Sequence, residues 1–468
     1  MKPNKILLFI IIIIATLALI VILFPSNGIR LFSKTLRFPF LNDILIRNHI
    51  QEEDPEETLN QWNVYNKNED TALETKRKDT VKYLETILKK MEGSFELPNG
   101  NLSYFVPFFQ KAEAARAEQK IVRVMYYGDS QIELDRFSSN LRQFFQEKFG
   151  GGGPGMAPFI QTIPSGALNQ SYSGDFTCFS LWGEVHKNKT DDYGPFAKMY
   201  KIDGQNSFSA KTLSKKEESN RRDNYSNISL LINNMNGDFK AELTDNMSKI
   251  KYPLETDSLG IQLLEFPLNF STQSFTISMN GSAYIYGILI DNGFGVAVDN
   301  IAMRGANGLH FTSMNDSLMH IIYKLLDVEM IVLQYGGNAV PGLSGENSVA
   351  AYVNNIILQI KYLQRVAPNI PILFVGPSDM LSIVDGELKT YRDLPYLVEK
   401  LSNEIPKSGA AFWNMYQVMG GANSMRAWVK KGWAGNDYVH FTSKGAHEIA
   451  NVLTQTFEAM YEHYRIMK

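Results

Sequence analysis

The chain has 468 residues, of which 44% are hydrophobic and 20% charged, a composition typical of a folded protein with room for two domains. Its formal net charge of −3 gives no sign of a surface for nucleic acid, which is set aside as a partner. Cys178 is the single cysteine, so an internal disulfide and a cysteine-based zinc site are excluded. His186, His310 and His320 have no acidic partner at metal-ligand spacing, and no metal or other cofactor is expected.

The first strong signal is an uncharged apolar run from Ile6 to Phe24, directly after Lys5. At about 1.5 Å per residue this run approaches the roughly 30 Å thickness of a bilayer core, whereas the apolar part of a cleaved signal peptide is about 7–15 residues long. We therefore expect residues 1–27 to be an inner-membrane anchor, with the rest of the chain in the periplasm or outside the cell. A signal peptide cleaved near Ser26–Gly28 is the alternative.

Residues 28–118 begin with a polar, weakly patterned stretch that includes the acidic run Gln51–Glu57. Such a stretch is typical of a solvated stalk. A helical period appears near Val81–Gly93, so we expect the stalk to end in a helical lead-in to the next domain.

From Ile121 onward, short apolar runs typical of buried strands alternate with longer segments of helical period. Strands separated by helices of this length indicate an α/β fold, in which helices flank both faces of a parallel sheet. The expected strands are 121–128, 329–337, 371–378 and 410–416, and the expected helices are 137–150, 347–369, 391–406 and 443–464.

Residues 157–299 interrupt this alternation with short runs of alternating polarity, turn residues and no helical period. We expect an inserted all-β domain of sandwich size between 119–156 and 300–468 of the α/β domain. Some of its aromatic residues are candidates for stacking on sugar rings, although core packing is the commoner role. Trp182, Tyr193 and Tyr200 are the examples.

Three polar motifs fall where ligands bind in open parallel sheets, at or beyond the carboxyl ends of strands. Gly128-Asp129-Ser130 follows the first strand, and Gly337-Asn338 ends the second. Asp437 and His440 lie in the loop before the last helix, and Arg304–Gly308 is a weaker motif that can offer a backbone N–H. Each motif alone is commonly a turn or a helix cap, but together they indicate a serine nucleophile with a base and an amide donor.

In this order the motifs resemble the four sequence blocks of the SGNH hydrolases, also called GDSL esterases. The resemblance covers residues 121–155 and 299–468. The blocks match Gly128-Asp129-Ser130, Gly305, Gly337-Asn338 and Asp437-x-x-His440.

Two positions depart from the family pattern, because Gln131 stands where leucine is common and Ala339 where aspartate usually follows the asparagine. Neither change removes a catalytic atom. The long β insertion further resembles the peptidoglycan and polysaccharide O-acetyl esterases, in which a jelly-roll module interrupts the hydrolase fold.

The resemblance implies a catalytic triad in which Ser130 is the nucleophile, His440 the base that takes its proton, and Asp437 the group that orients the imidazole. It implies an oxyanion hole made of the Ser130 N–H, the Gly305 N–H and the Asn338 amide, with Gly308 as the alternative to Gly305. We also expect the chain to turn at Gly128 because a side chain there would crowd the turn.

The function expected from these residues is that of a serine esterase that removes O-acetyl groups from a cell-envelope or dietary polysaccharide through an acyl-serine intermediate. One alternative is an O-acetyltransferase that acts on a glycan together with a membrane-bound O-acyltransferase. Another is a non-catalytic glycan-binding scaffold. Because both ends of the insertion are tethered near the expected site, we expect it to form one wall of the catalytic cleft.

Overall fold

The computed structural model describes most of the chain from Glu53 onward and a few positions before it. Contacts divide the chain into two units, residues 1–53 and 54–468, and the first contains an antiparallel pair, β1 (Ile29–Leu31) and β2 (Lys34–Leu36). The described residues are 16, 29–31, 34–36, 53–62, 91, 93–181, 191–213, 225–384 and 386–468.

The expected membrane anchor, Ile6–Phe24, lies outside the described residues except for residue 16. Nearly all of the expected lead-in helix at 81–93 lies outside them as well. Among the helices that the structure describes, none has both the length and the apolar character needed to span a bilayer. The anchor therefore stays a prediction.

The second unit contains a six-stranded sheet in the order β16-β4-β17-β18-β21-β3. All neighbouring pairs are parallel except the last, in which β3 runs antiparallel to β21. The four strands expected from the sequence are all present, and the α/β fold class is confirmed. The strands are β3 (Phe95–Glu96), β4 (Ile121–Gly128), β16 (Gly295–Ala302), β17 (Val328–Gln334), β18 (Ile372–Val375) and β21 (Ala411–Trp413).

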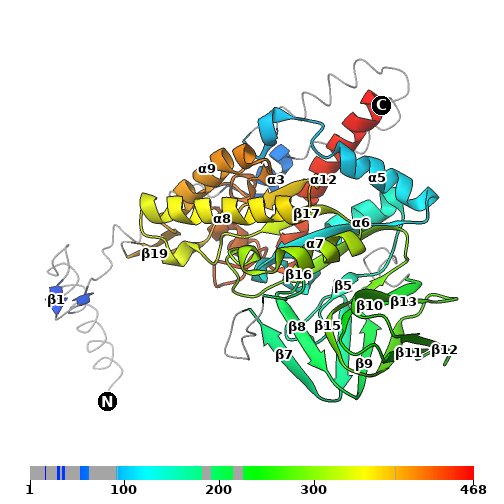
Figure 1. The fold of residues 1–468 in the computed structure, drawn as a ribbon. Helices are drawn as coiled ribbons and strands as arrows, with labels where there is room; N and C mark the ends of the chain where they lie inside the picture. The colour runs from blue at the N-terminus through cyan, green and yellow to red at the C-terminus, as the bar shows by residue number, and fades with distance from the viewer. Residues whose placement is uncertain are drawn as a thin grey trace, which may run out of the picture. The chain divides into compact units, whose positions relative to one another are not determined.

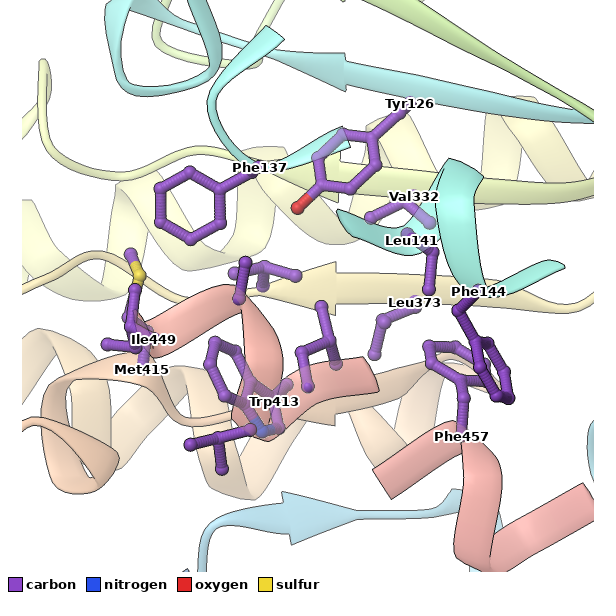
Figure 2. Packing of buried hydrophobic residues seen from close by; sticks show 14 of the residues in the cluster. Tyr126, Phe137, Leu141, Phe144, Val332, Leu373, Trp413, Met415, Ile449 and Phe457 are labelled. Atoms are coloured by element: carbon purple, nitrogen blue, oxygen red, sulfur yellow. The ribbon is translucent and has the colours of Figure 1, made fainter. Parts of the chain in front are cut away.

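Both faces of this sheet are buried, as the continuous apolar strands predict. Along β4, Val124 and Tyr126 point into one core cluster, and Met125 and Tyr127 into the other. Figure 2 shows the first cluster, where strand residues meet Phe144 and Phe457 from two helices. The first face is covered by α5 (Val106–Ala117), α6 (Ser138–Phe149) and α12 (Ser443–Met467), and the second by α7 (Asp316–Leu325), α8 (Glu346–Val366) and α9 (Leu394–Glu404).

Part of the expected stalk is packed into the α/β domain, which corrects that prediction. Leu59 of α3 (Pro55–Trp62) is buried, and this helix contacts α10 (Met415–Val418), α11 (Ser424–Lys430) and α12. Phe105 and Phe108, at the start of α5, are fully buried in the first cluster. A few apolar residues in a polar segment are enough to attach it to the core, and the average polarity of the segment conceals them.

The inserted domain is a sandwich of two antiparallel sheets around its own apolar core (Figure 1). One sheet has the order β13-β10-β15-β8-β7, with β5 also paired to β15, and the other the order β12-β11-β14-β9-β6. Its strands are β5 (Gly155–Ala157), β6 (Leu168–Ser173), β7 (Phe176–Ser180), β8 (Lys198–Ile202), β9 (Gln205–Thr212), β10 (Asn227–Asn234), β11 (Phe239–Asp245), β12 (Lys251–Thr256), β13 (Gly260–Pro267), β14 (Ser274–Asn280) and β15 (Ala283–Asp291).

The boundaries of the insertion differ from those expected at 157 and 299. Strand β5 already pairs with β15 of the sandwich, whereas β16 pairs in parallel with β4 of the central sheet, from Gly295 opposite Ile121 to Ala302 opposite Gly128. Because β15 passes into β16 through a short turn without a helix, the sequence shows no change of pattern where the chain re-enters the α/β domain.

Buried charges join the insertion to the central sheet. The Arg123 guanidinium of β4 donates to Asp299 of β16 over 3.0 Å and to Asp291 at the end of β15. Asp299 also accepts a 2.7 Å hydrogen bond from the backbone N–H of Met156 in β5. The strands that enter and leave the insertion are therefore held to the same part of the sheet.

The glycine-rich stretch before β5 has a packing role. A Cβ on Gly153 would lie 2.3 Å from the carbonyl oxygen of Ile290, so only glycine lets the two backbones approach. In the described part of the chain the remaining elements are a hairpin, β19 (Leu381–Val384) and β20 (Glu387–Thr390), and short 3₁₀ helices at Pro98–Gly100, Ser130–Asp135, Phe311–Ser313, Val340–Gly342 and Pro406–Ser408.

Candidate active site

Ser130 stands at the carboxyl end of β4, where the chain leaves the sheet. A Cβ on Gly128 would lie 2.9–3.0 Å from the side chain of Ile132, so a larger residue would crowd the turn, as expected. The Asp129 carboxylate accepts a 2.9 Å hydrogen bond from the Gln131 N–H and caps the 3₁₀ helix that begins at Ser130. The turn thereby places the serine side chain at the edge of the sheet.

The three residues expected to form a triad are connected by hydrogen bonds. Ser130 Oγ lies 2.8 Å from His440 Nε2, and His440 Nδ1 lies 2.7 Å from Asp437 Oδ2. An ionised carboxylate only accepts hydrogen bonds, so Nδ1 carries the hydrogen and Nε2 is left to accept the serine proton. This is the geometry that a serine nucleophile and its general base require.

Asp437 also fixes the conformation of the loop that carries His440. Its Oδ1 accepts hydrogen bonds from the backbone N–H groups of Val439 (3.0 Å) and His440 (3.1 Å), while Tyr438 adopts a left-handed conformation with φ of 57°. Burial raises the pKa of Asp437, but the hydrogen bonds from His440 and Val439 outweigh it, so the pKa lies below its ordinary value. The following helix, α12, is capped by the Thr442 hydroxyl.

Two residues that were not predicted to belong to the site hold the histidine loop against the serine turn. Gln131 donates to the carbonyl oxygen of Val439 over 2.6 Å, and its own carbonyl accepts from the Phe441 N–H over 3.4 Å. Arg136 donates to the carbonyl oxygens of Phe441 (2.8 Å) and Ser130 (2.6 Å). The only sequence signal was the departure at Gln131, where a polar residue replaces the common leucine.

Ser130, His440 and Asp437 line an open cleft of about 650 Å³, and Gly305 and Asn338 line the same cleft. Asn338 donates one N–H to the Ala306 carbonyl oxygen over 3.0 Å, and an amide nitrogen has a second hydrogen that can face a ligand. Gly308 is not among the residues lining the cleft, and a Cβ there would lie 2.9 Å from the Tyr335 ring. The position of Gly305 therefore favours it over Gly308 as a donor.

Two acidic residues of the serine turn lie beside the triad. Burial raises the pKa of Asp129 to about 6, against the opposing effects of the Gln131 N–H and of His440. Glu133 is buried and forms a two-point ion pair with Arg304, at 2.7 Å and 2.6 Å, and the Arg304 side chain is 62% exposed. Within the described residues, no group of three or more His, Cys, Asp or Glu side chains is placed to hold a metal ion.

Within the residues that the structure describes, the inserted domain does not line the catalytic cleft, contrary to the expectation that it forms one wall. All the described residues that line the cleft belong to the α/β domain, between Asp129 and His440 but outside the sandwich. Tyr193 and Tyr200 are 3% and 1% exposed, so they are core residues and cannot stack on a sugar. Trp182 lies outside the described residues.

Comparisons with known proteins support the fold. No family model matches the chain, and no curated protein matches it significantly. A solved structure of a peptidoglycan O-acetylesterase matches with a TM-score of 0.62 and 19% identity, over 77% of this chain and 97% of that one. A family two carbohydrate esterase from Cellvibrio japonicus matches over 63% of this chain and 98% of that one, but its TM-score of 0.24 and 11% identity are too low to carry an argument.

The first of these matches extends beyond the α/β domain, because that domain alone is too short to account for the covered share of the chain. The match therefore includes at least part of the inserted β domain. This is the fold expected from the resemblance to SGNH hydrolases with a β insertion.

Proposed function

We propose that this protein is a serine esterase that removes O-acetyl groups from a carbohydrate. The observation that carries the proposal is the hydrogen-bonded chain of Ser130, His440 and Asp437 in an open cleft. The likeness in fold to a peptidoglycan O-acetylesterase supports a glycan ester as substrate. The cleft is open, so an acetyl group on a polymer can reach Ser130.

In the first half of the reaction, Ser130 Oγ attacks the acetyl carbonyl carbon while His440 Nε2 takes the hydroxyl proton. Asp437 keeps the imidazole in the correct tautomer and stabilises its charged form. When the tetrahedral intermediate collapses, the bond to the sugar oxygen breaks, and that oxygen leaves with the proton from His440. The acetyl group is then bound to Ser130 as an ester.

In the second half, a water molecule gives a proton to His440 and attacks the acetyl-serine carbonyl. Collapse of this intermediate releases acetate and returns the proton to Ser130. In both halves the carbonyl oxygen gains negative charge, which the Asn338 amide and the N–H groups of Gly305 and Ser130 would stabilise. Each such donor typically contributes about 2.7–4 kcal/mol to the transition state.

The test is acetate release by the full chain from acetylated xylan, acetylated peptidoglycan and O-acetylated chitooligosaccharides, with the Ser130→Ala variant as control. We expect acetate from at least one of these glycans with the wild type and none with the variant. Release from an aryl acetate alone would argue for an esterase of a different substrate class. A sugar acceptor added to the same assay separates hydrolysis from acetyl transfer, because transfer yields an acetylated acceptor instead of acetate.

We further propose that residues 1–27 anchor the protein in the inner membrane with the catalytic domain on the periplasmic or outer side. The support is the uncharged run from Ile6 to Phe24 after Lys5. Fractionation of cells should recover the full chain with membranes, and deletion of residues 1–27 should release it. An intact mass that lacks these residues would instead indicate a cleaved signal peptide.

A further inference from the structure

A second cavity, of about 150 Å³, lies where the inserted domain meets the α/β domain, and we call it the junction cavity. Leu134, Asp135 and Arg304 contribute to it from the α/β domain, and Met156, Gln170 and Lys198 from the entry segment and strands of the insertion. The proposed reaction uses none of these six residues as a catalytic group.

The junction cavity and the catalytic cleft share one wall. Ser130, Gln131 and Glu133 of the serine turn line the cleft, whereas Leu134 and Asp135, the next residues, line the junction cavity. Leu134 and Asp135 both have a left-handed backbone conformation, with φ of 60° and 63°. This conformation turns the chain from one cavity to the other.

Arg304 is part of the same wall, because its side chain lines both cavities and is fixed by the ion pair with Glu133. The buried guanidinium of Arg142 donates hydrogen bonds to the Asp135 carboxylate and forms an ion pair with it. A ligand in the junction cavity would therefore lie against the same turn that carries Ser130.

The chemistry of the lining indicates a small amphipathic group. Met156, Ala157 and Phe196 are buried apolar residues of the lining. The side-chain amide oxygen of Gln170, Oε1, is shielded from solvent. It accepts no hydrogen bond from the residues that the structure describes. A shielded amide oxygen without a donor is unfavourable, because it has lost its hydrogen bonds to water without replacing them. Rotation about the last side-chain bond lets this amide turn toward a molecule in the cavity.

We propose that the junction cavity binds the acetamido group of an N-acetylated sugar that neighbours the sugar carrying the ester. The inference rests on the proposed esterase function and adds a subsite to it. The acetamido methyl would lie against Met156 and Phe196, and the acetamido N–H would donate to Gln170. The volume has room for the four heavy atoms of this group. Binding energy gained there would orient the neighbouring ester at Ser130.

The test is binding of N-acetylated chitotetraose, which carries no O-acetyl ester, to the full chain by calorimetry, with xylotetraose as the sugar that lacks acetamido groups. Thr162→Trp blocks the mouth of the cavity, where Thr162 is exposed and contacts Lys198. Gln170→Leu removes the amide at similar size. The matched control is Thr177→Trp, at another exposed threonine of the insertion that does not line the cavity.

We expect about tenfold weaker binding of chitotetraose by Thr162→Trp and Gln170→Leu, no change with Thr177→Trp, and weaker binding of xylotetraose by the wild type. Equal affinities of wild type and Thr162→Trp, equal affinities for the two sugars, or absence of chitotetraose binding would each overturn the proposal. Because the binding assay needs no ester, chitotetraose binding without acetate release from any glycan would refute the proposed esterase and leave the subsite intact.

Discussion

The α/β domain and the inserted β domain bury their apolar residues in different ways, and the difference separates their functions. All but the first residue of β4 are buried, because helices cover both faces of the central sheet. In β11 of the sandwich, buried residues alternate with partly or fully exposed ones, because one face of each sheet is left to solvent. When both faces of a sheet are buried, a ligand can reach the sheet only at the strand ends, so a binding or catalytic site forms there.

The same contrast explains why all the described residues that line the catalytic cleft belong to the α/β domain. Ser130 and Asn338 follow strands, and His440 precedes a helix. The positions of these elements are fixed by packing on both sides. The insertion is held to this framework by the buried Arg123 and contributes only to the neighbouring junction cavity. Substitutions at strand ends should thus affect every ester, and substitutions in the insertion should affect only glycan substrates.

The largest effect is expected for Ser130→Ala, with a fall of about 10⁴-fold or more in kcat on an aryl acetate, because the nucleophile is lost. The hydroxyl supports no packing, so the unfolding midpoint should match that of the wild type. The measurement is steady-state kinetics together with thermal unfolding. Turnover near the wild-type rate would refute the assignment of the nucleophile.

Asn338→Ala should lower kcat by about 10²–10³-fold with little change in KM, because the amide is needed mainly when charge develops on the carbonyl oxygen. The effect should be the same for an aryl acetate and for an acetylated glycan, since the donor acts on the acetyl group itself. A change confined to KM would instead place Asn338 in substrate binding.

Gln131→Leu introduces the residue that is common in the family and removes both hydrogen bonds to the histidine loop. Two such bonds contribute about 1–3 kcal/mol together, so kcat should fall about tenfold or more while KM stays within twofold. The pH profile of kcat should change as well, because His440 is less firmly held. Gln131→Glu keeps the acceptor for the Phe441 N–H and should recover part of the activity, whereas an unchanged pH profile in Gln131→Leu would argue against a positioning role.

Asp129→Asn tests the buried carboxyl of the serine turn. The pKa of Asp129 is about 6 in the folded protein, above its ordinary value of 3.8, so the folded state binds the proton more tightly and wild-type stability falls as pH rises from about 4 to 6. The asparagine side chain does not ionise, so it makes no such pH-dependent contribution to stability. The variant should gain about 2–3 kcal/mol of stability relative to the wild type between pH 4 and pH 7. Thermal unfolding at both pH values measures this gain, and a pH-independent difference would contradict it.

The smallest effect is expected for Phe270→Ala in the insertion. Phe270 is 69% exposed but lines neither the catalytic cleft nor the junction cavity. Its loss should change kcat/KM by less than about twofold for both an aryl acetate and an acetylated glycan. A selective loss of activity on the glycan would show that the insertion binds sugars over a wider surface than the junction cavity.

The sequence by itself determined the α/β class, the presence of an all-β insertion and the residues that meet at the edge of the sheet. These features depend on local periodicity and on the rule that the carboxyl ends of parallel strands share one edge. Ser130 and His440 are 310 residues apart in the chain, yet both follow from that rule. Their catalytic roles remain predictions that the geometry supports.

Only the tertiary structure decided where β16 belongs, that α3 and α5 are packed, and that Gln131 and Arg136 hold the histidine loop. It also decided that the described residues of the insertion line a second cavity and not the cleft. The sequence pattern of a strand that follows a short turn is the same whichever sheet the strand joins. Hydrogen bonds such as that from Gln131 to Val439, and the wall shared by two cavities, depend on how distant segments pack, and no local pattern in the sequence records that packing.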